Sequence, residues 1–209
     1  MGFYPVSLDL TDRPCVVIGG GVIAERRVAA LLEAGASVTL VSPSLTVALA
    51  SLADAGRIRH VARGYERGDL AGAALVLTAV DDPSIGAAAA AEARERAIWV
   101  NAADDPANCD FILPGLVRRG VLTVAVGSGG ASPALTRALR EHLDATLGVE
   151  WAALGELASG ARLELRAAGR AAGAEAWRRA LGGDVRALLA EGRIDDARER
   201  LRARLDLVP

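Results

Sequence analysis

Five short apolar runs alternate with segments of helical periodicity in the first 103 residues, and this alternation constrains the fold more than any other feature. The runs are typical of β-strands: PCVVI, SVTLVSPS, RIRHVA, AALVLTAV and IWVNAA. AALVLTAV is apolar throughout, as expected for a strand that is buried on both faces. Alternating strands and helices build a parallel sheet covered by helices, joined by right-handed crossovers. We therefore predict an α/β fold for this part of the chain.

The pattern changes after residue 103. The stretch FILPGLVRRGVLTVAVGSGG predicts one or two further strands. A helix then begins, with Ser132 as its cap and Pro133 at its first position. From Gly148 onward the sequence is helical in character. We predict three parts, covering residues 1–113, 114–150 and 151–209.

Composition excludes several classes of function. Of the 209 residues, 52% are hydrophobic and 24% are charged, which is typical of a globular protein. The net charge of -2 gives no support to nucleic-acid binding. Every basic residue is Arg, which excludes a lysine Schiff base and a Walker-type phosphate loop. The two cysteines form no CxxC pair and have no zinc-site spacing with either histidine, so no metal site is predicted.

The sequence predicts neither a secretory signal nor a membrane span. The N-terminal stretch MGFYPVSLDLTDRP lacks a basic region followed by an apolar segment. No apolar run approaches the ~20 residues that are needed to cross a bilayer. We expect a cytoplasmic protein that does not bind membranes.

A glycine run follows the first predicted strand and precedes the first predicted helix. The segment GGGVIA fits the G-x-G-x-x-G/A fingerprint of dinucleotide-binding sites. In that pattern Gly19 permits a tight turn, Gly21 lets a pyrophosphate approach the backbone, and Ala24 allows close packing of helix on strand. The free N–H groups and positive dipole end of the helix attract the phosphates. The sequence therefore predicts a Rossmann-type cofactor site.

The loop after the second predicted strand bears on the identity of the cofactor. Where an acid for the adenosine ribose usually stands, the chain has Ser42, followed by Pro43 and Ser44. This loop contains no Arg or Lys for a 2′-phosphate, whereas hydroxyls and backbone amides can bind a ribose diol. We predict NAD, and we also assign Thr78 and Ala79, at the end of the fourth predicted strand, to the cofactor site.

The stretch NAADDPANCDF follows the fifth predicted strand directly. Asp, Asn and Pro in such a cluster are typical of a turn. In an open parallel sheet, however, ligands bind outside the carboxyl ends of the strands. The stretch therefore also borders the predicted cofactor cleft. Its composition is compatible with a turn or a site, and its location favours a site.

Six motifs occur in an order that resembles one enzyme family: GGGVIAERR, LVSPS, TAVDDP, NAADDP, FILP and VAVGSGGASPALTRALRE. The chain resembles precorrin-2 dehydrogenase, which also forms the N-terminal half of siroheme synthase, closely over residues 1–150 and loosely beyond them. The resemblance implies NAD-dependent oxidation of precorrin-2 to sirohydrochlorin in siroheme biosynthesis. In some members it also implies ferrochelatase activity, with ferrous iron as a substrate.

The same resemblance implies an architecture. Residues 1–113 would form the NAD-binding Rossmann-type domain, residues 114–150 a dimerisation and substrate segment, and residues 151–209 a helical C-terminal domain. The protein is expected to be a homodimer. Because the sequence stops at Pro209, we expect the methyltransferase step of siroheme synthesis to be carried out by another protein.

The resemblance also assigns roles to single residues. The catalytic aspartate of the family's N-x-x-D-x-P stretch falls on Asp104, and no role is implied for Asp105 or Asp110. Transfer of a hydride to the nicotinamide leaves protons for a base, and a carboxylate beside the nicotinamide suits that task. The remaining assignments are nucleotide contacts at Val22, Ile23, Pro43 and Ser44 and a substrate contact at Ser128.

Arginines are the expected partners of a substrate that carries many carboxylates. Arg137 and Arg140 lie on the helix that Ser132 caps and are our substrate-binding candidates, with Arg118 and Arg119 as further ones. An alternative function is an NAD(H)-sensing module whose helical tail regulates a partner protein. A sensor needs no base, so Asp104 favours the enzyme.

Overall fold

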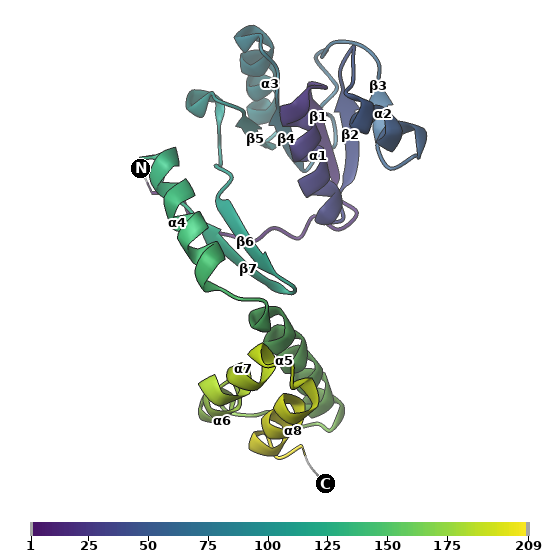
Figure 1. The fold of residues 1–209 in the computed structure, drawn as a ribbon. Helices are drawn as coiled ribbons and strands as arrows, with labels where there is room; N and C mark the ends of the chain where they lie inside the picture. The colour runs from purple at the N-terminus through teal and green to yellow at the C-terminus, as the bar shows by residue number, and fades with distance from the viewer. Residues whose placement is uncertain (1, 208–209) are drawn as a thin grey trace. The chain divides into compact units, whose positions relative to one another are not determined.

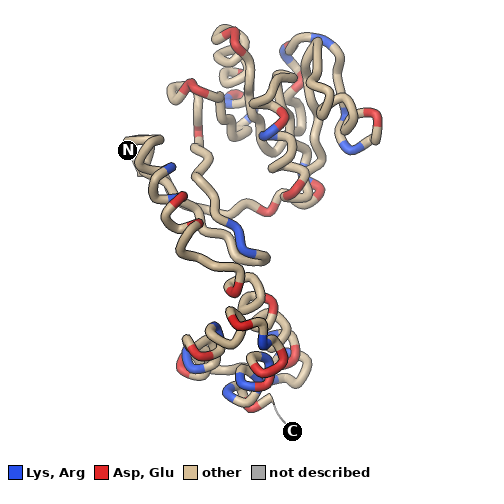
Figure 2. Tube along the Cα trace, viewed as in Figure 1, with Lys and Arg blue, Asp and Glu red and all other residues tan. Residues whose placement is uncertain are grey.

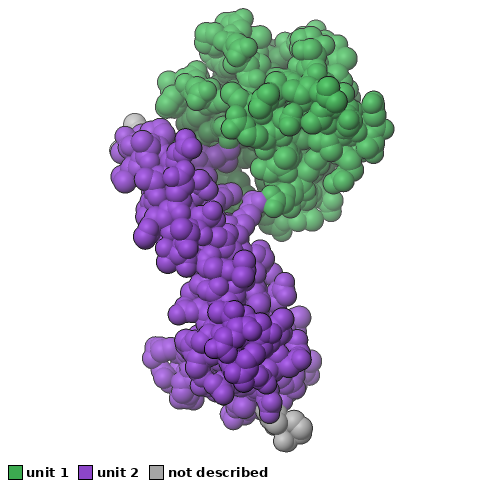
Figure 3. Space-filling model, viewed as in Figure 1, with its two compact units in different colours: residues 1–112 green, residues 113–209 purple. Residues whose placement is uncertain are grey.

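The computed structural model describes residues 2–207 and divides into two compact units, Met1–Ile112 and Leu113–Pro209 (Figure 3). Each unit has its own core and is described by itself. The predicted separation of residues 114–150 from residues 151–209 stays a prediction, because the division into units places a single boundary.

A five-stranded sheet forms the centre of the first unit (Figure 1). Its strands are β1 (Pro14–Ile18), β2 (Ser37–Val41), β3 (Arg59–Val61), β4 (Leu75–Thr78) and β5 (Trp99–Ala102). All neighbouring pairs are parallel, and the order is β3-β2-β1-β4-β5. This order confirms the predicted Rossmann-type sheet, in which the first strand is central and the carboxyl ends share one edge.

Helices cover both faces of this sheet. On one face, α1 (Val22–Glu33) and α2 (Val47–Asp54) pack on a core that includes Val17, Leu40 and Leu77. On the other face, α3 (Pro83–Glu95) packs Ala89, Ala90 and Ala93 against β1, β4 and β5. The strand side chains alternate between the two cores, and β4 is therefore buried throughout.

Local residue signals mark the ends of two helices of this unit. Asp82 caps α3 by accepting a hydrogen bond from Ser84 N at 2.8 Å, and Pro83 occupies the first helical position. Gly35 follows α1 with a φ of 77°, a left-handed conformation that suits glycine at the end of a helix.

A buried carboxylate ties α3 to the loop before β4. The side chain of Glu92 is fully buried and accepts hydrogen bonds from Tyr65 Oη (2.5 Å), Gly68 N (2.9 Å) and Arg96 Nε (2.7 Å). Burial by itself would raise the pKa of Glu92, but these donors overcome it and hold the pKa below its usual value of 4.5. The ionised side chain therefore belongs to the packing of this unit.

The second unit begins with a β-hairpin and a helix. Strands β6 (Gly115–Arg119) and β7 (Leu122–Val126) pair antiparallel in a sheet of their own. The prediction of one or two further strands is thus resolved as two, and they do not extend the parallel sheet. Helix α4 (Pro133–Thr146) follows and packs on the hairpin, and Ser132 caps it by accepting a hydrogen bond from Leu135 N at 3.2 Å.

Four helices complete this unit: α5 (Glu150–Ala167), α6 (Ala174–Ala180), α7 (Gly183–Ala190) and α8 (Ile194–Arg204). They enclose a core that includes Leu154, Val185 and Leu201, with Trp151 and Trp177 packed against it. Charges of both signs alternate over these helices (Figure 2). Within residues 2–207, no helix is long and apolar enough to cross a membrane.

Candidate cofactor and catalytic site

The three glycines between β1 and α1 differ in what surrounds them. Gly19 has a φ of 114°, and a Cβ built on it would lie 2.1 Å from the carbonyl oxygen of Ala79. A Cβ on Gly20 would lie 1.8 Å from the carbonyl oxygen of Ser44. A Cβ on Gly21 would meet no atom within 4 Å. The fold therefore requires glycine at the first two positions, whereas the space at Gly21 is open to a ligand.

This open space lies at the N-terminus of α1. Gly21 is the N-cap of the helix and supplies no side-chain cap, so the first N–H groups of α1 are available to an anion. Val22 and Ile23 follow with exposed fractions of 63% and 38%. Ala24 is fully buried against the sheet, which brings helix and strand close together as predicted. The glycine loop fits the pyrophosphate of a dinucleotide.

The loop after β2 is tied to the glycine loop. Thr46 N donates to Gly20 O at 3.0 Å, and Thr46 Oγ1 donates to Glu25 Oε2 at 2.8 Å. Ser42 has an exposed fraction of only 4%, and its hydroxyl donates to Ser44 O at 2.7 Å. Ser42 therefore shapes the loop from inside. The exposed residues that the loop presents to a ligand are Pro43 and Ser44.

The other assigned cofactor residues end β4, next to the glycine loop. Thr78 is buried, and Ala79 N donates to Ile18 O at 2.8 Å. The carbonyl of Ala79 stands against Gly19, as described above. The structure thus brings the ends of β1, β2 and β4 together at the carboxyl edge of the sheet, where Rossmann-type folds bind their cofactors.

The loop after β5 is a braced turn that contains the short helix η1 (Pro106–Asn108). Cys109 Sγ donates to Ala102 O at 3.1 Å and accepts from Ala102 N at 3.2 Å. Asp110 Oδ2 accepts from Val100 N at 3.1 Å, and Asp105 Oδ2 accepts from Asn108 Nδ2 at 2.7 Å. Asp105, Cys109 and Asp110 therefore hold the loop, which agrees with the absence of an implied catalytic role for the two aspartates.

Asp104 differs from its neighbours. Its side chain is exposed and, among residues 2–207, makes no hydrogen bond or ion pair. Its φ of 58° is left-handed, which is uncommon for a residue other than glycine and is maintained here by the bracing around it. Strained backbone of this kind clusters at functional sites. The loop is therefore both a turn and a candidate site, and Asp104 is the carboxylate that it presents.

The substrate-binding candidates of the second unit are already engaged with their own unit. Ser128 Oγ donates to Ser132 O at 3.0 Å and accepts from Ser132 N at 3.1 Å, which supports the start of α4. Arg137 and Arg140 both pair with Glu141, at 3.0 and 3.4 Å. Arg119 donates to Leu147 O at 2.6 Å. A role of these residues toward a substrate stays a prediction.

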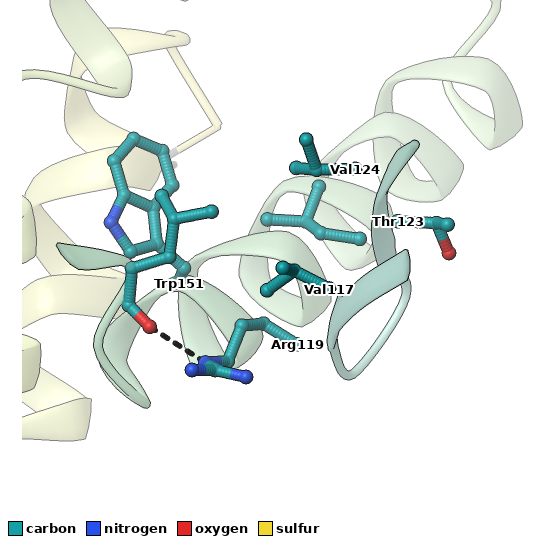
Figure 4. A pocket seen from close by; sticks show the side chains of 7 residues that line it. Val117, Arg119, Thr123, Val124 and Trp151 are labelled. Carbon is teal, nitrogen blue, oxygen red and sulfur yellow. Dashed lines mark hydrogen bonds between the residues drawn. The ribbon is translucent and has the colours of Figure 1, made fainter. Parts of the chain in front are cut away.

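A cavity of about 230 Å³ lies between the hairpin and α5 in the second unit. Trp151 lies opposite Val117 and Val124, with Arg119 at the rim (Figure 4). The walls of the cavity are almost entirely apolar, and no pattern in the sequence indicates it. Among the described residues, no group of three or more His, Cys, Asp or Glu side chains is placed to hold a metal ion.

Comparison with known proteins identifies the class of the first unit. A family model described as "Putative NAD(P)-binding" matches residues 6–115, and the chain belongs to this family. The match supports a nicotinamide dinucleotide as the cofactor of the glycine loop.

Two curated relatives define the resemblance more narrowly. The chain is 40% identical to a siroheme synthase of Thioalkalivibrio sulfidiphilus over 99% of its own length and 42% of the relative. It is 46% identical to a siroheme synthase of Methylobacillus flagellatus over 76% of its own length and 34% of the relative. The chain thus spans less than half the length of these relatives. The resemblance to siroheme synthase seen in the motifs is confirmed.

A solved structure has the same fold. The protein titled "SirC, precorrin-2 dehydrogenase" superposes with a TM-score of 0.71 over 98% of each chain, at 24% sequence identity. At this identity the match supports the architecture alone.

Proposed function

We propose that the protein is a precorrin-2 dehydrogenase, which oxidises precorrin-2 to sirohydrochlorin with NAD in siroheme biosynthesis. The observation that carries this proposal is the 40% identity with a siroheme synthase over 99% of the chain, which extends beyond the cofactor domain. A shared cofactor domain alone would support many oxidoreductases, whereas similarity through the second unit favours a shared substrate.

Each part of the site has a task in this reaction. The open space at Gly21 and the N–H groups of α1 receive the pyrophosphate, and Pro43 and Ser44 face the adenosine. Bound NAD supplies the hydride acceptor. Asp104, exposed and free of hydrogen bonds within the described residues, takes the proton that the macrocycle loses. Its braced left-handed backbone sets the direction in which the side chain leaves the loop, which favours proton transfer from a held substrate.

We also propose NAD rather than NADP. The exposed part of the loop after β2 offers Pro43 and a hydroxyl, but no cation for a 2′-phosphate. Arg63 follows the neighbouring strand β3, but both of its terminal nitrogens bind Asp69, each at 2.7 Å. The preference is expected to be modest, since this loop has no acid to repel the extra phosphate. A higher kcat/KM with NADP than with NAD would contradict the proposal.

The second unit supports a homodimer. None of the residues of α4 is buried, although leucines repeat along the helix. Leu135 and Leu139 have exposed fractions of 58% and 45%, and Leu116 and Val121 of the hairpin have 40% and 62%. Apolar side chains gathered on neighbouring elements are typical of an interface between subunits. Light scattering should give the mass of a dimer, and a monomer at micromolar concentration would contradict this part of the proposal.

Anaerobic incubation with precorrin-2 and NAD tests the function directly. The absorbance of sirohydrochlorin and NADH should rise together. Binding of NAD without any turnover would instead favour the alternative, an NAD(H)-sensing module. Insertion of ferrous iron, which the resemblance implies for some members, stays a prediction that the same assay tests when ferrous iron is added after the oxidation.

A further inference from the structure

One arginine of the first unit is half-buried and has no partner. Arg27 lies on α1, and among residues 2–207 its guanidinium makes no hydrogen bond and no ion pair. Three of the arginines that we predicted to bind substrate, Arg119, Arg137 and Arg140, have partners within their own unit, as described above. A guanidinium that loses water without gaining a partner is unfavourable for the protein alone, and a bound anion offsets that cost.

The fold directs Arg27 toward the loop after β5. Arg27 lies between Ala24 and Leu31 along α1, one turn from each, and both of these residues are buried on the face that packs on the sheet. On that same face of the sheet, Leu77 of β4 pairs with Asn101 of β5. Arg27 and the side chain of Asn101 therefore share the α1 face of the sheet, near its carboxyl edge.

Two hydrogen-bond acceptors of this region matter for Arg27. The carboxylate of Asp104 influences its charge, and the Asn101 side-chain oxygen has no donor among the described residues. Burial lowers the pKa of the Arg27 guanidinium, and the carboxylate of Asp104 opposes this by favouring the protonated form. Asn101 has an exposed fraction of 5%, and its Oδ1 accepts no hydrogen bond from any described residue. Its Nδ2 is used, donating to Phe111 O at 2.8 Å. A buried acceptor without a donor is unusual and points to a bound hydrogen-bond donor, whereas the guanidinium of Arg27 offers donors to an anion.

We propose that Arg27 binds a carboxylate of the substrate beside Asp104. This inference rests on the proposed function and adds to it a named residue and a named chemical group. A polycarboxylate macrocycle that approaches the ionised Asp104 is repelled by it, and a cation on the adjacent helix reverses that repulsion. The planar guanidinium also binds a carboxylate through two parallel hydrogen bonds, which orients the macrocycle over the base.

A comparison of Arg27→Gln with Arg26→Gln tests the inference. Arg26 is exposed on the same turn of α1 and serves as the matched control. Arg27→Gln should raise the Kd for sirohydrochlorin and the KM for precorrin-2 by ~10–100-fold, as expected for a charged hydrogen bond that is lost. It should change kcat less than KM and leave the Kd for NAD unchanged. Arg26→Gln should change none of these quantities.

Salt dependence separates a binding role from a structural one. The Kd of the wild type for sirohydrochlorin should rise with ionic strength, and that of Arg27→Gln should rise less steeply. If Arg27→Gln fails to fold, Arg27→Lys replaces it. Its Kd for sirohydrochlorin should rise less, because lysine keeps the charge but cannot form the two parallel hydrogen bonds of the guanidinium. Wild-type affinity and salt dependence in the Arg27 variant would overturn the inference alone. A wild type that neither binds sirohydrochlorin nor oxidises precorrin-2 would overturn the proposed function and this inference with it.

Discussion

The two units differ in how completely they bury their apolar side chains. In the first unit α1, α2 and α3 all contribute buried residues, and the strands between them are covered on both faces. In the second unit α4 has no buried residue, and the hairpin beneath it leaves Leu116 and Val121 exposed. The first unit therefore completes its core from its own chain. The second presents apolar side chains to solvent, and we propose that a second copy of the protein covers them.

The charges follow the same division. Glu92 of the first unit is fully buried among its donors, so its charge is part of the core. Asp184 of the second unit pairs with Arg200 and Arg204 at the surface. The proposed chemistry also concentrates in the first unit, where Asp104 and the glycine loop lie at one edge of the sheet.

The largest expected effect is on turnover, at Asp104. Asp104→Asn removes the base and keeps a residue type that tolerates the left-handed φ of 58°, whereas alanine would add strain. We expect kcat to fall ~10²–10⁴-fold, with the melting temperature and the Kd for NAD unchanged. Asp105→Asn is the control, and it should lower stability more than kcat because Asp105 binds Asn108. Near wild-type turnover by Asp104→Asn would remove the general-base role.

The second effect concerns the two kinds of glycine. Gly21→Asp places bulk and negative charge in the open space at the start of α1, so the Kd for NAD should rise ~100-fold or more while the protein stays folded. Gly20→Ala should do the opposite and unfold the first unit, since its Cβ would lie 1.8 Å from Ser44 O. Calorimetric titration and a thermal melt of both variants measure the contrast. Unchanged NAD affinity in Gly21→Asp would refute the cofactor assignment.

The third effect is on assembly. Leu135→Glu puts a charge on the apolar surface of α4, and we expect the dimer to dissociate ~10–100-fold more readily. The melting of the first unit should be unaffected by this change. Leu163→Glu, on an exposed position of α5 at 66%, is the control and should leave the mass of the dimer unchanged. Equal masses for the wild type and Leu135→Glu would place the interface elsewhere.

The smallest effect is the pH dependence of stability. Because folding lowers the pKa of Glu92, the folded state binds its proton less readily than the unfolded state. Its contribution is present above pH 4.5 and is lost as the pH falls through the lowered value. We expect Glu92→Gln to reduce the acid sensitivity of the melting temperature by a few degrees. An unchanged pH profile in this variant would show that the charge of Glu92 does not contribute to stability.

The exposed carboxylate of Asp184 allows the same measurement at the surface of the second unit. Hydrogen bonds from Arg204 and then Arg200 lower the pKa of Asp184 to about 2, so its contribution is lost only between its usual 3.8 and that value. Asp184→Asn should change the melting temperature slightly, and added salt should erase the difference. The difference caused by Glu92→Gln should persist in salt because that group is buried.

The sequence predicts the first unit well because its elements carry local signals. The β-branched runs, the glycine fingerprint and the Asp82–Pro83 start of α3 all specify structure within a few residues. The sequence does not predict the pairing of β6 with β7. Nearby residues indicate that a segment is a strand, but they do not determine which strand it pairs with. In the structure β6 and β7 pair antiparallel through a short turn, so they form a separate sheet and do not join the parallel one.

The candidate site was predicted at its backbone and less well at its side chains. Asp104 and Gly21 are recognised because a motif fixes their positions on a turn and at a helix start. Ser42 and Ser128 have hydroxyls that turn inward to their own loops, which no motif reveals. Arg27 was missed because an arginine on a helix is usually solvated, and only the packing of α1 shows that it is half-buried without a partner.

The central position of β1 has a consequence for how the protein acquires its cofactor. Its neighbours β2 and β4 lie far apart in the sequence. The turn at Gly19 also packs against the carbonyl of Ala79, which follows β4. Long-range parallel pairing is slow, and the pairing of β1 with β4 spans more of the chain than the contacts among the helices α5–α8. During refolding we expect helical structure to return before NAD can be captured. The time at which NAD affinity appears during refolding then reports when the sheet is complete.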